Sequence, residues 1–83
     1  MTAASTELAY QEYSRAVSAA RAAWHAAVLQ SLEALNGAVI GTTAHDMEAV
    51  KAALMLHREA GYEALSLYGQ AVHTAFDRFS RAL

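Results

Sequence analysis

Two long stretches of helical periodicity, separated by one break and uninterrupted by proline, restrict most strongly how this chain can fold. Apolar residues recur at steps of three and four from Tyr10 to Leu35, and again from Met47 to Leu83. This spacing places them on one face of a helix. The chain has no proline and is rich in alanine, which is the best helix former. The sequence therefore predicts an all-α protein.

The first helix is predicted over about residues 6–36. Ser5 or Thr6 is a suitable N-cap. An Asn-Gly pair ending at Gly37 is a stop signal, because glycine tolerates the left-handed conformation that ends helices. Val39 and Ile40 then belong to a turn over about residues 37–42, where we expect them to fold back over the end of the hairpin. In the alternative, the helix continues through Ile40.

The second helix is predicted over about residues 43–82, with Thr43 as N-cap and Asp46 at the third helical position. This is a variant of the capping box. Near the other end, Asp77 and Arg81 are spaced as an ion pair one turn apart. A connection of a few residues makes two helices antiparallel neighbours. The chain is therefore predicted to be one domain, a long antiparallel helical hairpin.

Both helices carry more apolar residues than a two-helix contact can cover. Leucines, methionine and tyrosine also lie off the main stripes, namely Leu8, Leu29, Met55, Leu56, Tyr62 and Leu67. Helices that are apolar on several sides are buried on several sides. We therefore expect the hairpin to bind a second copy and form a four-helix bundle.

The predicted hydrophobic interface is formed by aromatic and aliphatic residues of the two stripes. It comprises Trp24, Leu54, Leu65, Tyr68, Val72, Phe76, Phe79 and Leu83. Trp24 is expected to be the main packing anchor of the first helix, because a large aromatic ring buries the most area.

Composition excludes several classes of function. A net charge of −2 and a pI near 6.0 give no basic footprint for nucleic acid. The absence of cysteine excludes a disulfide scaffold and a thiolate site. No stretch reads as a signal peptide or a membrane span, so we expect a cytoplasmic protein that does not cross the membrane. No nucleophile elbow or phosphate loop is present, so no enzyme and no cofactor are predicted.

The four histidines do not form a recognisable metal motif. His73 and Asp77 lie one helical turn apart, as do His45 and Glu48, but the Glu-x-x-His motif of bundle metal sites is absent. His57 lies on the apolar stripe, and we expect it to be a core-edge histidine with one hydrogen-bond partner. No metal site is predicted.

Residues 28–83 resemble a phasin, a family of small helical proteins that coat polyhydroxyalkanoate granules in bacteria. The resemblance comes from a helix ending in Leu-Asn-Gly at Gly37, a short polar link, and a second helix that reads Asp-Met-Glu-Ala-Val from Asp46. It continues as Leu-His-Arg-Glu-Ala-Gly-Tyr-Glu-Ala-Leu up to Leu65. The chain departs from the family in lacking proline in the link and in carrying His57 where glutamine is common.

Periodicity and resemblance together favour a non-enzymatic protein that self-associates and acts through hydrophobic surface, as a phasin-like granule coat or scaffold. Its partners would be itself and a hydrophobic polymer or lipid surface. The alternative is a helical module that binds a protein partner, such as a secretion-system co-chaperone or an assembly subunit.

Overall fold

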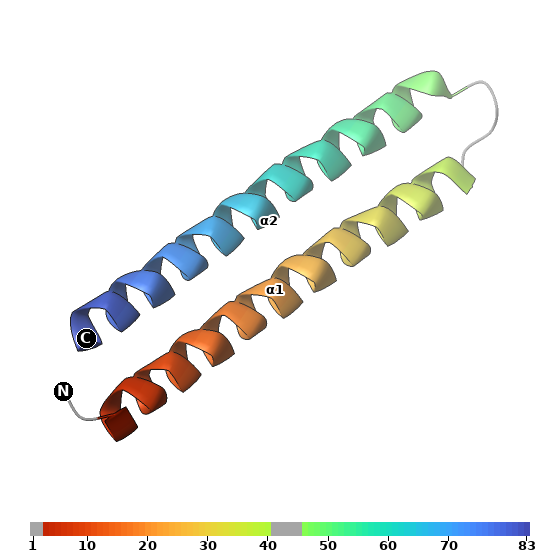
Figure 1. Ribbon diagram of the computed structural model, residues 1–83. Helices are drawn as coiled ribbons and strands as arrows, with labels where there is room; N and C mark the ends of the chain where they lie inside the picture. The colour runs from red at the N-terminus through yellow and green to blue at the C-terminus, as the bar shows by residue number, and fades with distance from the viewer. Residues whose placement is uncertain (1–2, 41–45) are drawn as a thin grey trace.

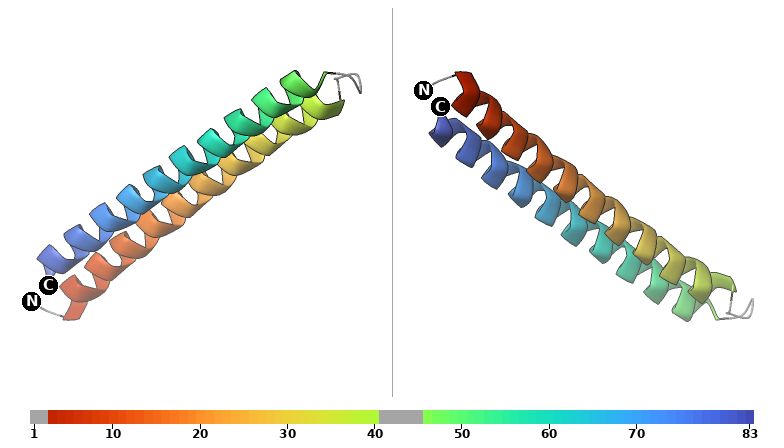
Figure 2. Two further views of the ribbon diagram at one scale, coloured as in Figure 1. Left: turned by 90° about the horizontal axis from the view of Figure 1, so that it is seen from above. Right: turned by 90° about the horizontal axis from the view of Figure 1, so that it is seen from below.

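The computed structural model describes residues 3–40 and 46–83, which form two long helices, α1 (Ala3–Ile40) and α2 (Met47–Ala82). The helices run antiparallel as a hairpin, and the start of α1 and the end of α2 lie at the same end (Figure 1). They stay side by side along their length in both views of Figure 2. The predicted all-α hairpin is thus confirmed.

Within the described residues, the hairpin is a thin slab with no third element against it. Its Cα atoms extend over 66 × 15 × 7 Å. Each side chain therefore either lies in the single contact between the helices or points to the outside. This shape determines where the candidate interaction surface lies.

The end of α1 differs from the predicted stop. The helix begins at Ala3, so Ser5 and Thr6 lie inside it, and it continues through Gly37 to Ile40, as in the alternative. Ala38, beyond the glycine, is half-buried. Continuing the helix adds backbone hydrogen bonds and packing that outweigh the cost of about 1 kcal/mol for an internal glycine. Ile40 is 84% exposed, so the expected folding back of this segment is wrong.

The cap of α2 is Asp46 itself, not a residue three positions earlier. The Asp46 Oδ1 atom accepts a hydrogen bond from the backbone N–H of Ala49 at 3.1 Å. The expected N-cap, Thr43, lies outside the described residues. Near the other end of the helix, Arg81 and Asp77 form the predicted ion pair, with 3.1 Å between nitrogen and oxygen.

Alanines line the centre of the contact between the two helices. We call this row the alanine seam; it comprises Ala9, Ala20, Ala27 and Ala38 of α1 and Ala53, Ala60, Ala64, Ala75 and Ala82 of α2, all buried or half-buried. Within each helix, successive members are 4, 7 or 11 residues apart, close to whole numbers of turns. Small side chains at the contact allow two helices to approach closely. The seam therefore positions the larger side chains along its edges.

Candidate interaction surface

Large apolar side chains gather along one edge of the alanine seam. Tyr10 contacts Phe79 edge-on, with ring centroids 6.1 Å apart, and Trp24 lies against Tyr68 at 5.8 Å. These contacts across the hairpin tie the aromatic rows of both helices to the same side. Residues at helical spacing from these rings extend the rows along each helix. We call this surface the apolar face: Tyr10, Val17, Trp24, Val28, Leu32, Leu35, Leu54, Leu65, Tyr68, Val72, Phe76, Phe79 and Leu83.

Seven of the eight residues of the predicted hydrophobic interface fall into two groups on the apolar face, and the eighth, Val72, is half-buried. One group contacts the opposite helix: Tyr68 packs on Trp24, and Phe79 packs on Tyr10 and Tyr13. The other group projects outward and is at least half exposed: Leu54, Leu65, Phe76 and Leu83. Trp24 belongs to the first group but remains 36% exposed, so the hairpin alone does not bury it fully.

Almost nothing in the described part of the hairpin is buried. Ala64 and Ala75 alone among those residues fall in this class, each 6% exposed. The chain exposes 6361 Å² in total. A compact folded protein of 8.9 kDa exposes about 4,800 Å². The surplus, roughly 1,500 Å² on this scaling, is the additional surface of an extended two-helix slab.

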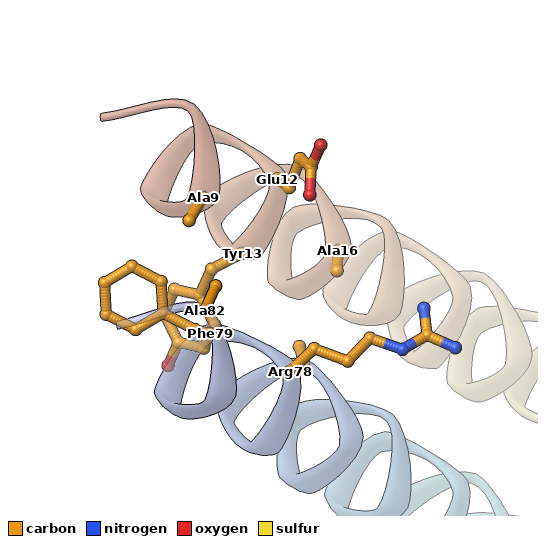
Figure 3. A pocket seen from close by; sticks show the side chains of 8 residues that line it. Ala9, Glu12, Tyr13, Ala16, Arg78, Phe79 and Ala82 are labelled. Atoms are coloured by element: carbon orange, nitrogen blue, oxygen red, sulfur yellow. The ribbon is translucent and has the colours of Figure 1, made fainter. Parts of the chain in front are cut away.

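The opposite side of the seam is shallowly hollowed and carries two exposed leucines, Leu56 and Leu67. One groove there is lined by alanines with Leu67 and with Trp24 and Tyr68, whose rings thus border both sides of the seam. Another is lined by alanines with Gln30, Glu63 and Leu67. At the open end, Arg78 stretches along the groove between the helices, and Glu12 lies on its rim (Figure 3). This side is referred to below as the opposite face.

Charged residues divide unequally between the two faces. Lys51 and Arg58 lie in the same seven-residue row as Leu65 and Val72, and Arg21 lies seven residues before Val28. The acids beside these rows are Glu7 and Glu48, and Glu48 forms an ion pair with Lys51, with 3.7 Å between oxygen and nitrogen. Acids outnumber bases on the opposite face. The acids there are Glu12, Glu33, Glu59, Glu63 and Asp77, and the bases are Arg15, Arg78 and Arg81. The apolar face therefore has a cationic rim, within a chain whose net charge is −2.

A polar contact joins the helices beside the apolar face. The Ser31 hydroxyl lies 2.7 Å from Nδ1 of His57 and donates a hydrogen bond to the carbonyl of Val28 at 3.2 Å. His57 thus has the single partner expected from its place on the stripe.

The described residues give no geometric sign of a metal centre. No three histidine, aspartate or glutamate side chains converge within residues 3–40 and 46–83. His73 and Asp77 therefore lack a third ligand there, and His45 lies outside the described residues. Neither described helix has a stretch apolar enough to span a bilayer.

Comparisons of the chain with protein-family models, with curated proteins and with solved structures found no match. The candidate surface is therefore defined by its geometry. The spacing of apolar residues in the sequence defines its rows, but two of its features were not predicted. These are the alanine seam, whose signal was the spacing of alanines by 7 and 11, and the cationic rim, whose signal was the row of Lys51 and Arg58.

Proposed function

We propose that this protein is a non-enzymatic, self-associating helical hairpin that works in the cytoplasm as a coat or scaffold, in the manner of a phasin. The observation that supports this function is the apolar face, which is exposed along the hairpin while only two alanines of the described chain are buried. Exposed apolar area of this extent marks a surface that meets a partner or an apolar phase.

Surface area supports self-association. A compact dimer of twice this mass would expose about 8,000 Å², against twice 6361 Å² for two separate hairpins. The difference, roughly 4,700 Å², falls in the range of obligate dimers. Two hairpins that meet through their apolar faces would form a four-helix bundle with a core of large side chains.

The coat function uses the same side chains. An amphipathic helix lies on an apolar phase with aromatic and aliphatic residues buried in it and the polar side in water. The outward group of Leu54, Leu65, Phe76 and Leu83 provides these residues along α2. The slab shape allows the whole length of the hairpin to lie flat on such a surface.

Two measurements on the purified protein test the proposal. Multi-angle light scattering at micromolar concentration should give twice the monomer mass or more, and the melting temperature should rise with concentration. Sedimentation with polyhydroxyalkanoate beads should deplete the protein from solution. A monomeric protein that melts independently of concentration and does not bind the beads would contradict the proposal. A helical module for a protein partner would then be the better interpretation.

A further inference from the structure

The apolar face carries its own cations, and this feature indicates the chemistry of the surface that it meets. Arg21 and Arg58 are exposed, and each lies seven residues before an apolar residue of the face, Val28 and Leu65 respectively. Lys51 precedes Arg58 in the same row and forms an ion pair with Glu48. The acids of the described chain lie mainly on the opposite face. A large apolar face with a cationic rim is the composition of a helix that lies on an anionic lipid interface.

We infer that the apolar face docks on an anionic phospholipid surface, with the aromatic and aliphatic side chains in the acyl region and the cations at the headgroups. This inference rests on the proposed function, since it names the surface that the coat would meet. In solution the same face would pair with a second copy. An anionic surface offers that face both an apolar phase and countercharges.

The length of the arginine and lysine side chains supports this orientation on the lipid surface. Long arginine and lysine side chains bury their methylene stems and keep the charged group in water. Arg58 lies over the ring of Tyr62 at 5.5 Å, which holds its guanidinium on the outer side of α2. Charges on the opposite face are separated from the lipid by the thickness of the hairpin, and exposed charges beyond about 10 Å are largely screened at 0.1 M salt. The rim therefore dominates the electrostatic attraction.

Vesicle flotation tests the inference directly. The full chain is mixed with vesicles of phosphatidylcholine alone, or of phosphatidylcholine with one third phosphatidylglycerol. Each cation near an anionic surface strengthens binding roughly fivefold. Lys51 is paired with Glu48 and Glu7 offsets one of the two arginines, so the net charge of the rim predicts roughly fivefold tighter binding to the anionic vesicles. Equal binding to both vesicle types, or no binding to either, would overturn the inference.

Two matched double variants locate the contact. Arg21→Gln with Arg58→Gln removes two cations from the rim, and Arg15→Gln with Arg81→Gln removes two from the opposite face. We expect the first pair to lose roughly 30-fold in binding to anionic vesicles, and the second pair to lose less than about threefold because of screening. Equal losses for the two pairs would overturn the inference. Circular dichroism verifies that both variants are helical.

The same experiment separates this inference from the proposed function. Light scattering and bead binding are measured on the same protein without phospholipid. A dimer that binds polymer beads but ignores anionic vesicles overturns the lipid inference and leaves the coat function in place. A monomer that ignores beads but binds anionic vesicles contradicts self-association and supports the lipid inference.

Discussion

Phe76 and Phe79 stand three residues apart but have different surroundings. Phe79 packs against the rings of Tyr10 and Tyr13, with centroids 6.1 Å and 5.5 Å away. Phe76 is 57% exposed and projects outward from the same face. One phenylalanine therefore holds the hairpin together, and the other is available to a partner surface.

Serine substitutions should separate these two roles. Phe79→Ser should lower the free energy of unfolding by roughly 1–3 kcal/mol, less than for a fully buried ring because Phe79 is only half-buried. Phe76→Ser should leave the dilute hairpin almost unchanged but weaken self-association and bead binding. Thermal melts and light scattering measure the two effects. Equal losses of stability from both variants would place both rings in one closed core.

The loss of stability on removing the Trp24 ring measures how far a second copy covers the apolar face. Its ring stacks on Tyr68 but is 36% exposed in the hairpin. Trp24→Ala should therefore cost about 1–2 kcal/mol of unfolding free energy at high dilution, and about 3–5 kcal/mol where a second copy covers the ring. Denaturant titrations at two protein concentrations measure both values. A cost that does not depend on concentration would mean that no second copy reaches Trp24.

At the scale of the helices, sequence periodicity predicted the two elements and the residues of the apolar face, but not which residues lie at the centre of the contact. A 3.6-residue stripe identifies an apolar side without showing where on it the partner helix lies. Here the alanine seam occupies the centre, and Leu54 and Leu65 are displaced to the edge. Gly37 does not end α1, although its sequence context predicts a stop. Tertiary packing at Ala38 favours a helix that continues past the glycine.

The two glycines of α2 should weaken it. An added Cβ at Gly61 or Gly69 would meet no heavy atom within 4 Å, and neither residue has a positive φ. Replacing either with alanine should raise the free energy of unfolding by about 0.5–1 kcal/mol. Thermal melts at low concentration measure this gain, with both variants compared with wild type. A fall in melting temperature for Gly61→Ala alone would show that a side chain occupies the space beside it.

For the whole molecule, shape is the most informative quantity. The radius of gyration is 18.9 Å, whereas a compact chain of 83 residues has about 12 Å. The hairpin is thus too extended to bury its own apolar side chains. A second copy laid face to face would thicken the slab without lengthening it.

Small-angle scattering tests this arrangement. A face-to-face dimer should double the forward scattering relative to the monomer, increase the radius of gyration by only a few ångströms and keep nearly the same maximum dimension. Dilution should reverse the change in forward scattering. A dimer with a much larger maximum dimension would indicate end-to-end contact, and the apolar face would then remain open.

The contact between Ser31 and His57 links the imidazole to the closure of the hairpin. The serine hydroxyl lies 2.7 Å from Nδ1 of His57 and 3.2 Å from the carbonyl of Val28, and its one hydrogen can serve either acceptor. Nδ1 therefore donates to the hydroxyl in one tautomer and accepts from it in the other. Separation of the two helices would release that nitrogen from the hydroxyl. The ¹⁵N chemical shifts of this one imidazole would then report whether the hairpin is closed, even while both helices remain intact.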